Sequence, residues 1–115
     1  MGTIASTNIG GSGSRTITET TMTASDTFVY DSTARMVLTL RNPTAGALSP
    51  VIDGDGATTV GISGVGQVDI SGGYAVGSIA ASEVVAIPLD TIAKYLAGTI
   101  AITGGTGLVA TLTKY

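Results

Sequence analysis

The apolar residues of this chain come in short runs that are separated by glycine and other turn-forming residues. Between residues 44 and 81 the runs are as brief as Val51-Ile52, or Val60 with Ile62. Such a run suits a strand of three or four residues, and the glycines allow turns or bulges where φ is positive. No run approaches the roughly 20 apolar residues of a membrane-spanning helix. The pattern therefore predicts an all-β chain of short strands with no membrane-spanning segment.

The clearest strand is Arg35–Arg41, in which Met36, Leu38 and Leu40 fall on one face. Side chains of a strand point alternately to its two faces, so this segment is predicted to be half-buried in a sheet. Asn42 and Pro43 end the strand, because proline offers no backbone donor and restricts the residue before it.

Three more strands are expected from residue type. Thr16–Thr23 is β-branched and rich in hydroxyl groups, and Thr27–Tyr30 lies between turn-forming residues. Glu83–Leu89 begins as a buried strand but contains Pro88, which cannot donate a hydrogen bond to a ladder. We therefore expect this last strand to lie at the edge of a sheet or to end at Pro88.

One short helix is expected over residues 90–97. Asp90 can accept hydrogen bonds from the free amides of a first turn, and Gly98 can adopt the left-handed conformation that often follows a helix. The apolar face of this segment holds Leu89, Ile92, Ala93 and Leu96. The segment is long enough for two turns at most.

The C-terminal residues are predicted to form a hairpin. Residues 99–103 and 108–114 both alternate, and a glycine-rich segment joins them. In this interpretation Leu112 is buried beside Ile100 or Ile102.

Residues 1–14 are predicted to be a flexible N-terminal arm. They hold only two sizeable aliphatic side chains, Ile4 and Ile9, and end in Gly10-Gly11-Ser12-Gly13-Ser14. That apolar area is too small to offset the entropy of ordering the segment alone. Ile4, Ile9 and Arg15 are therefore the candidate partner-binding residues, and the alternative is a frayed tail without a role.

The remaining residues, 15–115, are expected to form one domain. About 100–150 residues is the commonest domain size, and a chain of 115 residues can bury a core. Gly, Thr and Ser together make up 46 residues, which suits turns and strands. The fold class predicted is all-β, a small antiparallel β-sandwich or jelly-roll-like domain with the one short helix.

The composition removes most catalytic chemistry. The chain has no Cys, His or Trp, and therefore no thiolate or imidazole for nucleophilic, acid–base or metal chemistry. Its five basic residues are scattered singly and its net charge is -3, so no basic stripe could neutralise several phosphates. We expect no enzyme activity, no cofactor and no binding to nucleic acid.

The acidic residues provide two weak alternatives. Asp53 and Asp55 alternate with glycine like the start of a calcium loop, but Ala57 stands where a third ligand is needed. Glu19 or Glu83 could pair with an aspartate in a glycosidase, although a sugar cleft usually needs more aromatic side chains than this chain has. We interpret Asp53–Gly56 as a polar turn and expect no metal site and no catalytic residues.

The surface of the protein must be poor in charge. Charged residues make up 11% of the chain, against about 25% in an average soluble domain, and the mean hydropathy is +0.47. Much of such a surface is expected to be covered by other subunits, because obligate interfaces resemble a protein core. We expect a homo-oligomer, a dimer or a trimer.

Three features of the chain are similar to those of a known family: the Gly-Ser-Thr arm, Leu38-Thr39-Leu40-Arg41-Asn42-Pro43-Thr44 and Ala101-Ile102-Thr103-Gly104-Gly105-Thr106-Gly107. In these features the chain resembles the head decoration, or cement, proteins of tailed bacteriophages. The resemblance implies a structural protein made in the host cytoplasm that binds the outside of the capsid. There it would clamp neighbouring copies of the major capsid protein, without catalysis.

Two alternatives to capsid binding follow from the same residues. Tail and fibre proteins of phages share this compositional style. A small carbohydrate-binding module is the alternative from another class, and it would need Tyr30, Tyr74 and Tyr95 exposed on one face.

Overall fold

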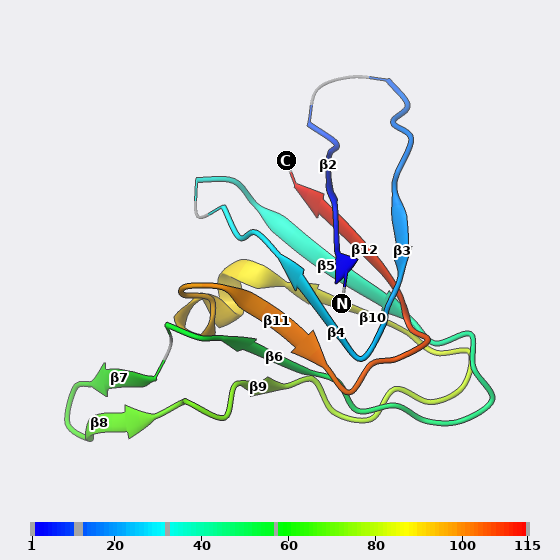
Figure 1. Ribbon diagram of the computed structural model, residues 1–115. Helices are drawn as coiled ribbons and strands as arrows, with labels where there is room; N and C mark the ends of the chain where they lie inside the picture. Colours follow the sequence, from blue (N-terminus) through cyan, green and yellow to red (C-terminus); the bar gives the residue numbers. More distant parts are fainter. Residues whose placement is uncertain (1, 11–12, 32, 57, 115) are drawn as a thin grey trace.

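Strands make up most of the regular structure of this protein. The computed structural model describes residues 2–10, 13–31, 33–56 and 58–114 (Figure 1). The elements in this part of the chain are, in order, β1 (Gly2–Thr3), β2 (Ser6–Asn8), β3 (Glu19–Thr21), β4 (Ser25–Phe28), β5 (Met36–Arg41), β6 (Val51–Gly54), β7 (Thr59–Ile62), β8 (Gly66–Asp69), β9 (Tyr74–Ala75), β10 (Val84–Pro88), the 3-10 helix η1 (Leu89–Tyr95), β11 (Ile100–Thr103) and β12 (Val109–Lys114). The predicted all-β class with one short helix is confirmed.

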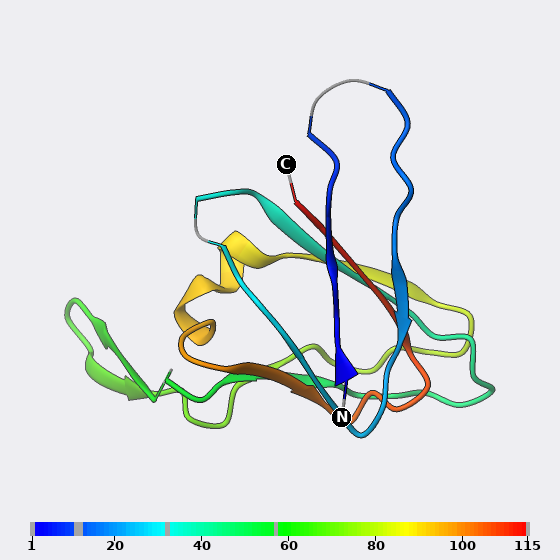
Figure 2. The same cartoon turned by 45° about the horizontal axis from the view of Figure 1, so that its top comes forward.

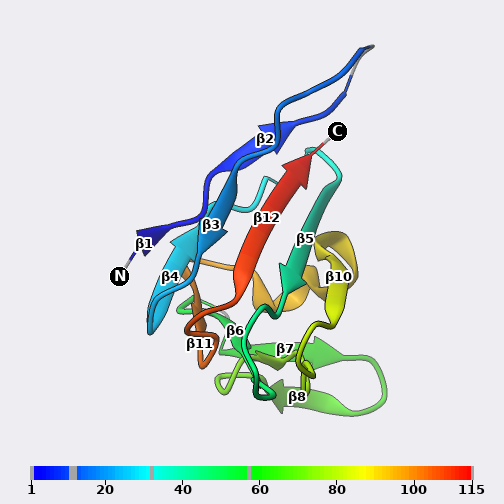
Figure 3. The ribbon, with the colours of Figure 1, turned by 90° about the vertical axis from the view of Figure 1, so that its right-hand side faces the viewer.

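The strands form two facing sheets and one separate hairpin. The first sheet has the order β1-β4-β11-β6-β9, and the second has the order β10-β5-β12-β2, with β3 also paired to β12. Figure 3 shows β12, β5 and β10 side by side in one layer. Most neighbours are antiparallel, but β1 on β4 and β2 on β12 are parallel. The hairpin β7–β8 extends away from both sheets (Figures 1 and 2).

Alternation along the strands builds the core between the two sheets. In β5 the apolar face is buried and the other face is half-exposed, as the sequence predicts. Both sheets contribute to a single apolar cluster, which includes Leu38, Leu40 and Leu112 from the second sheet and Phe28, Ile52 and Ile102 from the first. Burying one such side chain contributes about 1.5–3 kcal/mol, so this cluster is the main source of stability.

The edge position predicted for Glu83–Leu89 agrees with the strand order. Strand β10 pairs with β5 alone, and Pro88 lies opposite Val37 at the end of that ladder. A proline is tolerated there because an edge strand needs no donors on its outer side.

The predicted C-terminal hairpin is wrong. Strand β11 pairs with β4 and β6, whereas β12 pairs with β5, so the chain passes from one sheet to the other between them. Gly104 and Gly107 make that passage with φ values of +75° and +98°, which glycine adopts without strain. Leu112 is fully buried, as predicted. Two strands that face each other across a core show the same alternation as two strands paired in a hairpin, so the pattern could not distinguish them.

The expected α-helix is a 3-10 helix, and Asp90 makes no side-chain cap for it. The hydroxyl of Thr91 instead donates to the carbonyl oxygen of Pro88 at 2.6 Å. Ile92, in the middle of η1, has non-helical backbone angles (φ -120°, ψ 24°), so the segment consists of two short turns joined by a kink. Leu89, Ile92 and Leu96 are buried, and Tyr95 packs against the core.

The N-terminal residues pack on the domain, which the arm prediction did not anticipate. Strand β1 adds to β4, and β2 adds to β12, so residues 2–8 run from one sheet to the other. Ile4, between the two strands, is 2% exposed and belongs to the core. The expectation that Ile4 has no apolar neighbours in the chain is therefore wrong. That residues 15–115 fold by themselves stays a prediction.

One buried amide organises the loops at one end of the sandwich. Asn42 is fully buried, and its Nδ2 donates to the carbonyl oxygens of Gly46 and Ile79, both at 2.8 Å. Its Oδ1 accepts from the backbone amide and the hydroxyl of Thr44 at 3.0 and 2.6 Å. Both ends of the amide group are satisfied, and three separate positions of the chain are fixed by one side chain.

We predict that Asn42→Asp lowers the free energy of unfolding by about 2–4 kcal/mol, because it places an oxygen against the carbonyl oxygens of Gly46 and Ile79. Asn8→Asp is the matched control, since Asn8 is exposed and only accepts, from the amide of Gly10. The control should change the free energy by less than about 0.5 kcal/mol in denaturant unfolding. Equal effects of the two substitutions would contradict the role given to Asn42.

We also predict that Ile4→Ala destabilises the protein by about 2–4 kcal/mol, the usual loss for a buried aliphatic side chain and its cavity. Ile17→Ala is the comparison, because Ile17 is 46% exposed and should cost less than about 0.5 kcal/mol. Thermal or denaturant unfolding measures both. If Ile4→Ala proves as mild as Ile17→Ala, residues 2–8 do not pack as described.

Candidate functional site

The three predicted partner-binding residues do not lie together on one exposed surface. Ile4 is inside the core, and its amide donates to the carbonyl oxygen of Thr27 at 2.8 Å. Ile9 is half-buried, and its amide donates to the carbonyl oxygen of Lys114 at 2.8 Å. Arg15 is exposed and donates from Nη2 to the carbonyl oxygen of Gly10 at 3.1 Å. Of the three, Arg15 alone presents an exposed side chain in this arrangement.

A buried carboxylate holds the start of the N-terminal segment. Asp26 on β4 is fully buried, and its Oδ1 accepts from the backbone amide of Gly2 at 2.8 Å. The same side chain accepts from the amide of Thr23 at 2.7 Å and from the Thr23 hydroxyl at 2.9 Å. Hydrogen bonds to a carboxylate are stronger than neutral ones, so Asp26 fixes β1 to the turn before β4.

Exposed apolar side chains mark two projections of the molecule. The first projection consists of residues 9–10, which follow β2, and residues 13–18, which lead into β3 and include Ile17. The second is the β7–β8 hairpin, and Val65 lies in its turn. The three ribbon views show residues 13–18 and the β7–β8 hairpin extending from different sides of the protein (Figures 1–3). Val65 is 71% exposed. Sequence reasoning missed both residues, because an apolar residue in a loop or a turn gives no periodic signal.

Two more exposed apolar residues lie in or next to the sheet strands. Val29 follows β4 and is 78% exposed, and Val84 begins the edge strand β10 and is 56% exposed. Single exposed apolar residues are common on soluble proteins and carry no argument by themselves.

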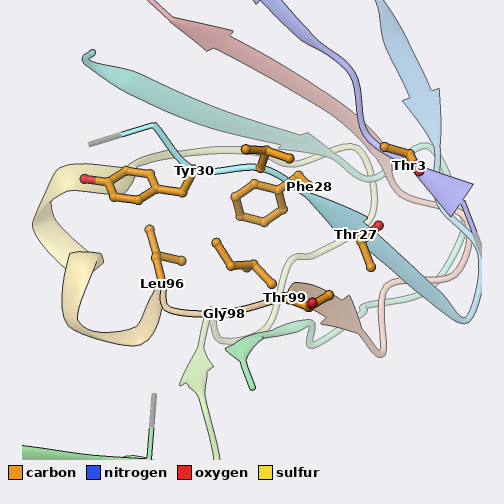
Figure 4. Close-up of a pocket in the computed structure, with 9 residues that line it drawn as sticks. Thr3, Thr27, Phe28, Tyr30, Leu96, Gly98 and Thr99 are labelled. Carbon is orange, nitrogen blue, oxygen red and sulfur yellow. The ribbon is translucent and has the colours of Figure 1, made fainter. Parts of the chain in front are cut away.

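A shallow pocket of about 360 Å³ lies where β4 and β11 diverge (Figure 4). Thr3, Thr27 and Thr99 contribute hydroxyl groups to it, and Phe28 and Leu96 contribute apolar surface. The residues that line it, within the described part of the chain, include no charged side chain. Such a lining can accept or donate hydrogen bonds but offers no general base and no strong nucleophile.

A second pocket, of about 240 Å³, lies between the start of β5 and the end of β10. Its charged residues are Arg35 and Asp90, and Met36, Val37 and Pro88 contribute apolar surface. Arg35 and Asp90 are both exposed.

The acidic turn Asp53–Gly56 packs against the segment before β11. Asp55 accepts from the backbone amide of Thr99 at 2.8 Å, and the amide of Asp55 donates to the Thr99 carbonyl oxygen at 2.9 Å. Over residues 2–10, 13–31, 33–56 and 58–114, no group of three or more His, Cys, Asp or Glu side chains is placed to hold a metal ion. Ala57, where a third calcium ligand would be needed, lies outside the described residues.

Two other aspartates shape turns. The hydroxyl of Thr33 donates to Asp31, and this hydrogen bond, with one from the Thr33 amide, lowers the pKa of the Asp31 carboxyl below its ordinary value of 3.8. Hydrogen bonds from the side chain and the amide of Ser71 likewise lower the pKa of Asp69. Both carboxyl groups are therefore ionised at neutral pH, and they act locally as acceptors.

The three tyrosines considered for carbohydrate binding are all partly buried and pack against the core. The rings of Tyr74 and Tyr95 lie 5.7 Å apart, centroid to centroid, at an interplanar angle of 59°. Tyr30 lines the larger pocket (Figure 4). Because none of the three stands exposed as a stacking platform, the carbohydrate-binding alternative loses the feature on which it depended.

Comparisons with known proteins identify no relative: no family model, no curated protein and no solved structure matches the chain. Within the described residues, no helix is both long enough and apolar enough to cross a membrane.

We predict that millimolar calcium, or a chelator, leaves the melting temperature unchanged, because Asp55 already accepts from the Thr99 amide and the described residues bring no third His, Cys, Asp or Glu to this turn as a ligand. Thermal unfolding with and without calcium measures this. A rise of several degrees in calcium would contradict the turn interpretation of Asp53–Gly56.

Proposed function

We propose that this protein is a structural component of a bacteriophage particle, located on the outside of the capsid. There it clamps neighbouring copies of the major capsid protein, and it acts as a homo-oligomer without catalysis. The observation that supports the proposal best is the low charge of the chain, in which charged residues make up 11%. The centres of protein–protein contacts are depleted of charged residues. The proposal assigns Ile17 and Val65, exposed on two projections, to the contacts with neighbouring subunits.

The dimensions of the molecule fit a clamp. Its principal extents are 44 × 37 × 23 Å, and the two projections extend from different sides of the sandwich, so each can reach a different neighbour (Figure 2). Between them lies the sandwich, whose apolar cluster, over the described residues, includes no residue of either projection. A clamp needs this combination, because the contacts hold neighbours together only if the part between them does not deform.

The low charge of the chain supports protein partners over nucleic acid. Arg15, Arg35, Arg41, Lys94 and Lys114 are its only basic residues, and the side chain of Arg41 lies 3.5 Å from that of Glu19. Such a surface has little attraction for a phosphate backbone. It suits hydroxyl and apolar contacts with another protein surface instead.

The experiment is co-sedimentation of the protein with empty phage shells. We predict that Ile17→Asp and Val65→Asp each weaken attachment by about tenfold or more, since a charge in an apolar contact must be desolvated without a partner. The melting temperature should change little, because both side chains are exposed.

Val84→Asp is the matched control, an apolar-to-acidic change at a 56% exposed position away from both projections. It should attach like the wild type. If all three variants attach equally well, the projections are not the contact surface, and absence of any binding to shells by the wild type would contradict the proposed function itself.

A further inference from the structure

The first residues of the chain are held mainly by strands that lie far from them in the sequence. Within residues 2–9, Gly2 and Ile4 are bound by Asp26 and Thr27 of β4, and Ile9 is bound by Lys114 at the end of β12. The parallel ladders of β1 and β2 connect the same distant strands. The segment therefore occupies an acceptor site that the rest of the domain builds, which has two strand edges and a place in the core for Ile4.

Only a short connection joins residues 2–9 to the rest of the domain. The acceptor site can therefore take this segment from its own chain or from another copy. The segment ends at the sequence Gly10-Gly11-Ser12-Gly13-Ser14, and the described residues 13–18 are exposed. Two hydrogen bonds join residues 7–10 to residues 15–18. Arg15 donates to the carbonyl oxygen of Gly10, and the Thr18 amide donates to the Thr7 hydroxyl.

We propose that the acceptor site between β4 and β12 also receives residues 2–9 of a second copy of this chain. This strand exchange is the contact that links the subunits of the homo-oligomer. The inference therefore rests on the proposed function, which includes that homo-oligomer. The occupant is a second copy, rather than an unrelated strand, because the site matches this segment in register, in the hydrogen bonds of Asp26 and in the cavity filled by Ile4. Exchange between copies reproduces the same contacts, so it costs little beyond association.

The balance between the closed and exchanged forms depends on concentration. A short linker holds its own segment near the site at an effective concentration on the order of millimolar, so dilute protein favours the closed form. Crowding of copies on a particle surface favours exchange. Reciprocal exchange between two copies closes a dimer, and cyclic exchange among three closes a trimer.

The experiment uses single cysteines in a chain that has none of its own. Thr3 and Thr27 are partners in the β1–β4 ladder, so Thr3→Cys in one full-length chain and Thr27→Cys in another meet within a ladder only if the segment crosses between chains. The two variants are mixed at about 1 mM and at about 10 µM in a glutathione redox buffer, and mixed disulfides are separated by non-reducing electrophoresis. Thr3→Cys mixed with Val65→Cys measures random contact, because Val65 lies on the distant hairpin.

We expect about tenfold more mixed disulfide from the Thr3 and Thr27 pair than from the control pair, and a larger fraction at the higher concentration. The double variant Thr3→Cys/Thr27→Cys shows whether the disulfide can form within one chain. If the double variant forms its internal disulfide, but the two single variants give no more mixed disulfide than the control pair, the inference is overturned.

If the double variant does not form its internal disulfide, the same comparison is made with Thr7→Cys and Thr113→Cys. Thr7 and Thr113 are partners in the β2–β12 ladder. Shell attachment of the wild type is measured separately. Attachment without mixed disulfide therefore contradicts strand exchange alone, and mixed disulfide without attachment contradicts capsid binding alone.

Discussion

The two sheets share one interior because every long strand, whichever sheet it joins, turns alternate apolar side chains toward the other sheet. This holds for β5 and β12 in the second sheet and for β6 and β11 in the first. The requirement also determines how the chain crosses between the sheets. Around Gly104–Gly107 and again at Ile4, the chain leaves one sheet and enters the other while its neighbouring apolar side chains stay in the core.

Two buried polar side chains fix the segments that the apolar core alone would leave unspecified. Asn42 binds the loop after β5 to the chain before β10, and Asp26 binds β1 to the turn that precedes β4. Each is fully satisfied, so neither weakens the interior as an unpaired polar group would. The N-terminal segment is thus held by one buried carboxylate, one buried isoleucine and two short ladders, and it can be exchanged as a unit.

The sequence predicts the strands better than their partners. The alternation of Arg35–Arg41 and the proline in Glu83–Leu89 are local signals, and both led to correct placements. The hairpin of residues 99–114 was wrong because burial alternates equally in paired and in facing strands. Ile4 was misjudged for a related reason: its neighbours come from distant strands, and a single isoleucine among polar residues has no periodic signal. The exposure of Ile17 and Val65 also depends on tertiary structure, so the candidate contact surface could not be predicted from the sequence.

The most direct test of this account is native-state hydrogen exchange at the amides of Ile4 and Ile9, measured by NMR at low protein concentration. Both amides donate to backbone carbonyl oxygens of the domain, Ile4 to Thr27 and Ile9 to Lys114. The account predicts that both exchange far more slowly than unstructured amides, and that Ile4, in the core, is the better protected of the two. Exchange of both amides at the rate of an unfolded chain would contradict the claim that the N-terminal segment joins the two sheets.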